Sequence, residues 1–211
     1  MTTTEAGLQA LVGPQFQALA DALAAEPPTI ADAPSLCAGW SVRHVVAHVT
    51  MAARYDGPAF MAELAEAGGD FDVLSETIAR RDGDLPFDTL INDLRSETMA
   101  PWAPPGGGSA GALSHVVIHG LDITAATGLP RTASDEATHA VLSTLTDGGA
   151  QPFGLDITGR SLRATDLDWQ LGDGPWVDAA AAELILALAR RQRPGVDLGD
   201  ATSVPSRVDL A

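Results

Sequence analysis

The spacing of apolar residues along the first 150 positions is the feature that most constrains the fold. Several segments place apolar side chains three and four positions apart, which is typical of amphipathic helices. Pro- and Gly-rich stretches separate these segments, so the chain is expected to turn back between them. The predicted helices comprise residues 5–25, 42–49, 58–81 with a break at Gly68-Gly69, 87–99, 110–127 and 134–146.

The ends of these helices are predicted from local signals. Ser41 and Ser109 are expected to be N-caps, and residues 80–84 are expected to form a polar turn. Met61 and Val73 are expected to point into the core.

The pattern changes after Gly148-Gly149. Residues 161–166 alternate like a strand, residues 169–171 offer a partner strand, and Trp176-Val177 is expected to form a third. Asp178 is then expected to cap a helix from Ala179 to Arg193. We therefore predict a mainly α protein: a four-helix bundle over residues 1–150, a small C-terminal α+β unit over residues 151–195, and a tail over residues 196–211.

Composition excludes several classes of function. A net charge of −16 argues against binding to nucleic acid or to an anionic membrane surface. No lysine is present among the 12 basic residues, which excludes Schiff-base chemistry and the lysine of a phosphate-binding loop. The single cysteine, Cys37, excludes an internal disulfide and is expected to be a small loop hydrophobe. A signal peptide and a membrane-spanning stretch are not expected, so a cytoplasmic location is predicted.

Five histidines are present, and their spacing suggests a metal site. His115 and His119 are four residues apart, so on a helix their rings lie on the same face and can bind one metal ion. His48, on another predicted helix, is the expected third ligand. His44 is the second choice for that position, and His139 is expected to be an ordinary hydrogen-bonded side chain.

Two further features have alternative interpretations. Asp122 lies one turn beyond His119 and either orients an imidazole N–H or is a surface carboxylate near a helix end. Residues 106–111 match glycine-rich phosphate-binding and nucleophile motifs, but both motifs need a preceding strand, and the Pro-rich residues 99–105 cannot form one. We reject both motifs and leave open only an anion at the N-terminal amides of the following helix.

Several short motifs are shared with a known family. They are Gly39-Trp40-Ser41-Val42-Arg43 before His48, His119-Gly120-Leu121-Asp122-Ile123 with Gly128-Leu129-Pro130, and residues 159–169, 172–175 and 186–191. With these motifs the chain resembles the DinB/YfiT-like metalloenzyme superfamily, and more closely its maleylpyruvate isomerase branch, the mycothiol-dependent enzymes. The resemblance covers most of residues 5–193, and its C-terminal part is the more specific.

The resemblance implies a DinB-like four-helix bundle that holds a divalent transition metal, with zinc expected and iron or nickel as alternatives. His48 and His119 match two of the family's ligand positions, and His115 stands where the isomerases usually carry Glu. Three neutral ligands would leave the metal a stronger Lewis acid. The set also resembles the iron site in the DinB-like part of ergothioneine-forming sulfoxide synthases. Arg190-Arg191 stands at the family's Gly-Arg pair, so Arg191 is either an anchor for a substrate carboxylate or a solvated arginine.

The function that the resemblance implies is a metal-dependent enzyme with a low-molecular-weight thiol, mycothiol, as co-substrate. It would isomerise a small electrophilic substrate or conjugate the thiol to it, with Asp122 and Arg191 in the catalytic machinery. The expected partners are the small-molecule substrate and the thiol, without nucleic acid or membrane, and a homodimer is left open. A metal-dependent hydrolase and a non-catalytic metal-binding bundle remain as alternatives.

Overall fold

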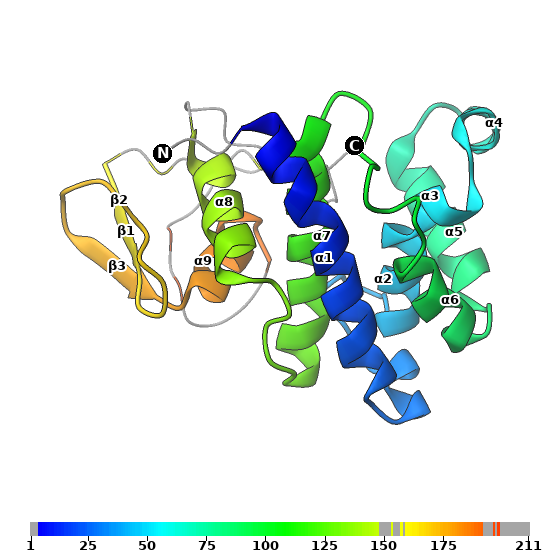
Figure 1. Cartoon of the computed structure of the whole chain (residues 1–211), viewed down its shortest axis with the longest axis horizontal. Coiled ribbons are helices and arrows are strands. Elements are labelled where there is room, and N and C mark those ends of the chain that lie inside the picture. Colours follow the sequence, from blue (N-terminus) through cyan, green and yellow to red (C-terminus); the bar gives the residue numbers. More distant parts are fainter. Residues whose placement is uncertain are drawn as a thin grey trace.

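The predicted mainly α architecture is confirmed by the computed structural model (Figure 1). The structure describes residues 4–147, 153, 157, 159–191, 196 and 198. The elements are α1 (Glu5–Ala24), the 3-10 helix η1 (Pro28–Asp32), α2 (Val42–Val49), α3 (Met51–Arg54), α4 (Gly57–Glu66), α5 (Phe71–Gly83), α6 (Phe87–Leu94), α7 (Gly108–Thr127), α8 (Asp135–Thr146), β1 (Ser161–Ala164), β2 (Gln170–Leu171), β3 (Trp176–Ala179) and α9 (Ala181–Leu188).

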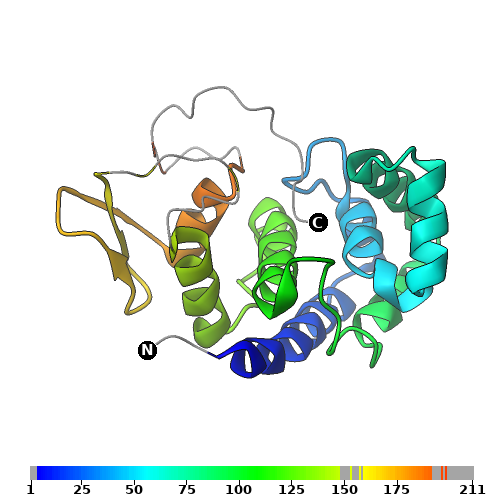
Figure 2. The same ribbon diagram turned by 90° about the horizontal axis from the view of Figure 1, so that it is seen from above.

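Helix α7 is the centre of the bundle. Figure 2 shows it between α2 on one side and α8 and α9 on the other, with α1 running alongside. Every residue from Ala112 to Thr124 is buried, and Gly128 ends the helix in the left-handed conformation with a φ of 76°. The polar side chains of such a helix must find partners inside the protein, because water does not reach them.

The same hydrophobic core joins the bundle to the C-terminal unit. Phe16 of α1, Val46 of α2, Ile118 of α7, Leu142 of α8 and Ile185 of α9 all belong to it. β1 lies in the middle of the small sheet, antiparallel to β2 and parallel to β3. The C-terminal unit therefore packs directly on the helices that carry the predicted site.

The expected tail falls mostly outside the described residues. Of residues 196–211 the structure describes Val196 and Leu198, and Leu198 is buried in the core. The division at residues 150 and 195 stays a prediction.

Several predicted helix ends are wrong, and side-chain partners explain three of them. Helix α7 begins at Gly108 without a Ser109 cap, because the backbone N–H of Ser109 donates to Glu5 Oε1 at 2.7 Å. The anion at this helix end is thus a carboxylate of the same chain. Asp178 does not cap α9, because it pairs with Arg163 of β1 at 2.7 Å. Residues 80–83, predicted as a turn, continue α5, where Arg81 reaches Glu63 of α4 at 3.1 Å.

Helices α6 and α9 are shorter than expected, and two apolar side chains are exposed. α6 ends at Leu94 and α9 at Leu188. Met61 and Val73 are 58% and 48% exposed, because α4 and α5 pack on a small separate core around Leu74 and Ile78. Their inward placement was therefore a wrong prediction.

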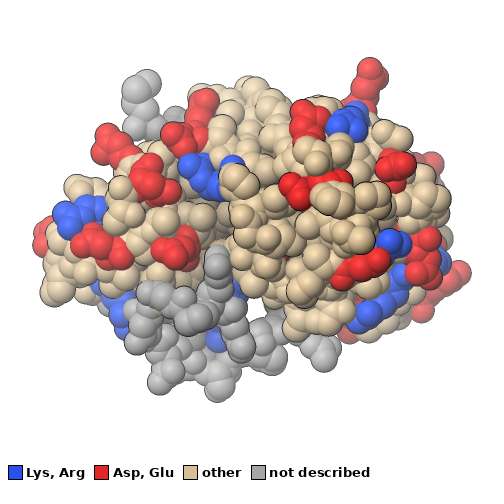
Figure 3. Space-filling model, turned by 90° about the horizontal axis from the view of Figure 1, so that it is seen from below, with Lys and Arg blue, Asp and Glu red and all other residues tan. Residues whose placement is uncertain are grey.

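The surface carries the negative charge that composition predicts. On the face in Figure 3, acidic side chains are scattered over both ends of the molecule, and the described part of that face has no continuous basic area. Within the described residues, no helix is both long enough and apolar enough to cross a bilayer.

Candidate metal centre

Helix α2 carries His48 near its C-terminal end and His44 at its start. Ser41 caps the helix, and its backbone N–H donates to His44 Nδ1 at 3.0 Å. His44 is therefore occupied in the cap, away from the predicted site. His139 is exposed on α8.

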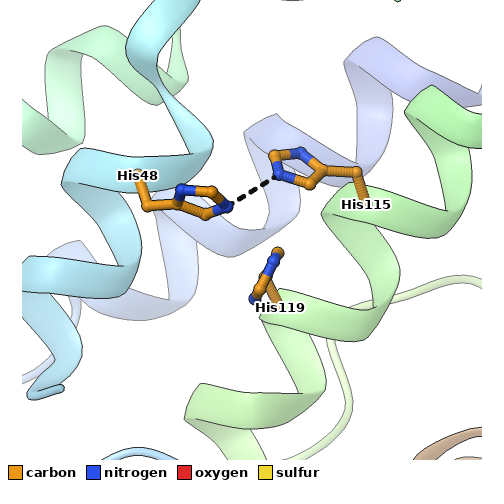
Figure 4. A group of neighbouring side chains, drawn as sticks. All are labelled: His48, His115 and His119. Atoms are coloured by element: carbon orange, nitrogen blue, oxygen red, sulfur yellow. Dashed lines mark hydrogen bonds between the residues drawn. The ribbon is translucent and has the colours of Figure 1, made fainter. Parts of the chain in front are cut away.

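The three predicted ligands, His48, His115 and His119, converge between α2 and α7, and we call them the histidine cluster (Figure 4). One potential ligand atom of each lies within 4.8 Å of the others. The Nε2 atoms of His48 and His115 are 3.1 Å apart. All three side chains are buried, with exposed fractions of 1%, 3% and 0%. The structure thus brings together residues that are 67 positions apart in the chain.

The protonation states in the histidine cluster suit a metal ion. Burial lowers the pKa of each ring below its usual value, and the neighbouring rings lower that of His48 further. Neutral imidazoles keep a lone pair free for a metal. His119 Nδ1 lies 2.9 Å from Asp122 Oδ2 and must carry the proton, because a carboxylate only accepts. His119 Nε2 is therefore a bare acceptor, buried and without a partner.

The donor atoms also fit by their separation. Two nitrogen ligands of a tetrahedral zinc ion, each bonded at about 2.0–2.1 Å, are about 3.3 Å apart. The 3.1 Å between the Nε2 atoms of His48 and His115 is close to this value. The histidine cluster is therefore a buried set of nitrogen donors that a divalent transition metal fits.

Asp122 connects the histidine cluster to the rest of the protein. Its side chain is fully buried and also accepts from Arg191, with Nε to Oδ1 at 2.8 Å and Nη2 to Oδ2 at 3.0 Å. Burial alone raises the pKa of Asp122, but the hydrogen bond from His119 and the charge of Arg191 outweigh it and lower the pKa to about 2. Of the two interpretations of Asp122, its position favours the orienting one over the surface carboxylate.

Arg191 reaches Asp122 from the C-terminal unit because of the way α9 ends. The N–H of Arg190 donates to the carbonyl of Ala187, and that of Arg191 to Leu186, which is the pattern of a Schellman cap. Arg190 takes the left-handed conformation, with a φ of 56°, which glycine adopts more easily than other residues. Arg191 is not solvated, since its side chain is 13% exposed and has a partner in the protein. Its contact with a substrate carboxylate stays a prediction.

Cys37 is the residue whose position the sequence did not indicate. Its thiol donates to Asp122 Oδ2 at 3.1 Å and lies 3.7 Å from His119 Nδ1, although 85 positions separate Cys37 and Asp122. Burial and the charge of Asp122 both raise the pKa of the thiol, so it stays protonated. Cys37, His119 and Asp122 also lie close enough to hold a metal. Their hydrogen bonds already use the converging atoms, however, so the histidine cluster is the better site.

Two tryptophans flank the histidine cluster. The ring of Trp40 lies 5.2 Å from that of His48, and the ring of Trp102 lies 5.2 Å from that of His115. Trp40 is part of the motif before His48, whereas Trp102 lies in the Pro-rich residues 99–105, for which the sequence predicts only that no strand forms. A lone tryptophan in such a loop carries no periodic signal that could have placed it.

Comparison with known proteins gives one family. Residues 12–101 match the family model described as the mycothiol maleylpyruvate isomerase N-terminal domain. A search of curated proteins found no significant match. A search of solved structures found none either. The matched segment carries His48 but not His115, His119 or Asp122. This match over residues 12–101 supports the maleylpyruvate isomerase family predicted from the sequence.

Proposed function

We propose that this protein is a metal-dependent enzyme that uses a low-molecular-weight thiol, mycothiol by family, to isomerise a small electrophile or to conjugate the thiol to it. The convergence of the histidine cluster is the observation that carries the proposal. Its location is proposed to be the cytoplasm, where such thiols are kept reduced. Zinc is the proposed metal, with iron or nickel as alternatives.

His48, His115 and His119 would hold the metal through one nitrogen each. When bound, a divalent metal would supply Lewis acidity, which lowers the pKa of a thiol that it coordinates. The chain itself supplies three neutral donors in a buried site. Because Arg191 offsets the charge of Asp122, the surroundings of the three rings add little net charge.

Asp122 and Cys37 would keep His119 in one tautomer. Asp122 holds the proton of His119 on Nδ1, so that the buried Nε2 is left as an acceptor. Cys37, which stays a neutral thiol, donates a hydrogen bond to the carboxylate and does not compete with the co-substrate as a nucleophile. The thiolate of the co-substrate would attack a substrate double bond that is conjugated to an electron-withdrawing group.

A metal-dependent hydrolase is the less favoured alternative. It needs a general base beside the metal to take a proton from water. Asp122 is the carboxylate in direct contact with a ring of the histidine cluster, and its oxygens are held by His119, Cys37 and Arg191. That carboxylate is therefore poorly placed to act as a base.

Metal analysis of the purified full chain tests the proposal. We expect about one equivalent of transition metal in the wild type and a large loss in His115→Ala and His119→Ala. His139→Ala is the matched control, because it removes an exposed imidazole outside the cluster, and it should keep the metal.

Turnover of an electrophile with and without added thiol then separates the candidate functions. Thiol-dependent turnover that is lost with the metal supports the proposal. Equal metal content in all four proteins refutes the site. Metal-dependent turnover without thiol favours the hydrolase, and a bound metal without any turnover favours a non-catalytic bundle.

A further inference from the structure

The two tryptophans beside the histidine cluster differ in exposure. Trp40 is 6% exposed, and its Nε1 donates to Glu76 Oε2 at 2.6 Å, so it is a fixed internal wall. Trp102 is only half-buried, although its ring is tilted by 49° against the buried ring of His115. Trp102 is therefore partly exposed to solvent while its ring packs against a proposed metal ligand.

Arg191, another half-buried side chain close to the site, is already engaged. Arg191 uses Nε and Nη2 for Asp122. Cys37 and Asp122, which contact His119, are buried. Among the described side chains in contact with the site, Trp102 is thus the one that combines partial exposure with an aromatic surface free of a charged partner.

The loop that carries Trp102 is fastened between α1 and α7. Gln9 Nε2 donates to the carbonyls of Ala100 at 2.6 Å and Trp102 at 3.3 Å, and Gln9 Oε1 accepts from Ser109 Oγ at 2.8 Å. The amide of Gln9 thus ties the loop both to α1 and to the start of α7.

Two glycines let the loop approach both helices closely. A Cβ added at Gly13 of α1 would lie 3.0 Å from Ala100 Cβ, and one added at Gly111 of α7 would lie 3.1 Å from Pro104 Cγ. The contacts of the loop with α1 and α7 therefore fix the position of Trp102 beside His115.

We propose that Trp102 is a substrate-contacting residue that selects flat, conjugated electrophiles, and that Gln9 is the positioning residue that holds it beside His115. This inference rests on the proposed function, in which the electrophile is a conjugated double bond near the metal. A flat π-system stacks on an indole, whereas a saturated chain of the same length and charge presents no such face. The loop thereby sets which electrophiles bind well.

Fumarate and succinate are a matched pair of probes, because both are dianions of similar length and only fumarate is flat and conjugated. Calorimetric titration of the zinc-loaded full chain measures their dissociation constants without relying on turnover. We expect the wild type to bind fumarate roughly two- to tenfold more tightly, the range that an aromatic contact supplies. Trp102→Ala should bring the ratio to about one, and Trp102→Phe should keep part of it.

Control variants separate this role from a general loss of structure. Trp176→Phe removes an indole that lies over Arg163 in the C-terminal sheet and should leave the ratio unchanged. Gln9→Ala should reduce the ratio of the two affinities. Gln17→Ala should not, because Gln17 also lies on α1 and donates to a backbone carbonyl, but to that of Arg95 and not to that of Trp102. Zinc content should be equal in all of these variants.

The outcomes distinguish the inference from the proposed function. An unchanged ratio in Trp102→Ala with full zinc content, equal affinities in the wild type, or no binding of either probe overturns the role of Trp102 and leaves the metal site intact. A wild type without zinc overturns the proposed function, and the inference falls with it.

Discussion

Replacement of Asp122 by Asn tests whether the buried ion pair holds the site together. The change keeps the shape of the side chain but removes the charge that Arg191 and His119 face. Because Asp122 is fully buried and the Arg191 side chain is 13% exposed, the variant leaves a nearly buried guanidinium without its counter-charge. Breaking a buried pair from one side costs about 3–5 kcal/mol, and the residual exposure of Arg191 puts the expected loss near the lower end, at about 3 kcal/mol.

The same variant is expected to weaken metal binding for a different reason. An amide can present its NH₂ group to His119 Nδ1, which favours the other tautomer and places a proton on Nε2. Removal of such an orienting partner typically lowers metal affinity by roughly 10- to 100-fold. Stability and metal affinity should therefore fall together in Asp122→Asn.

A double-mutant cycle with Arg191→Met separates the two effects. Urea unfolding of the metal-free proteins gives the free energies, so that metal binding does not contribute. We expect the double variant to be more stable than the sum of the single losses predicts, by about 2 kcal/mol, because it no longer buries an unpaired charge. Its metal affinity should stay low, since His119 still lacks its acceptor. A coupling energy below about 0.5 kcal/mol would refute the interpretation of Asp122 and Arg191 as a buried pair.

Two further predictions concern stability. The histidine cluster is neutral in the folded protein because burial lowers the pKa of each ring, whereas in the unfolded chain the same histidines take up protons below their ordinary pKa of 6.5. The stability of the metal-free protein should therefore be complete above pH 6.5 and fall below it by up to about 1.4 kcal/mol per histidine per pH unit. A urea midpoint that stays the same between about pH 7.5 and 5.5 would contradict this. Arg190→Gly should stabilise the protein by about 1 kcal/mol, because glycine adopts the left-handed conformation of that residue without strain; a lower urea midpoint in this variant would show that the Arg190 side chain matters more than its backbone.

The helices and the common face of His115 and His119 could be predicted because both depend on short-range spacing. His115 and His119 share a helix, so a separation of four residues fixes their common face. The addition of His48 needed only the expectation that amphipathic helices pack with their buried stripes together, strengthened by the motif before it. Alternation and turn residues also predicted the three strands of the C-terminal unit and the pairing of β1 with β2, but not the position of β3 beside β1.

The parts that failed depend on contacts between distant segments. Glu5 replaces Ser109 at the start of α7, and Arg163 takes Asp178 away from α9, so both caps were decided by residues that local signals do not include. Cys37 joined the site in the same way, through a loop that folds against α7 with the N–H of Leu36 donating to the carbonyl of Asp122 at 2.9 Å. Sequence spacing carries no information about such long-range pairs.

The histidine cluster has members on both sides of residue 101, and this has a practical consequence. A recombinant fragment trimmed to the matched segment would keep one imidazole of the three and would lose the central helix on which α1 and α2 pack. Such a fragment would expose the apolar faces of both helices, and it could not bring three imidazole nitrogens together around one metal ion. The proposed metal site and its partners therefore need the whole segment from α1 to Arg191, and a shorter fragment would not test them.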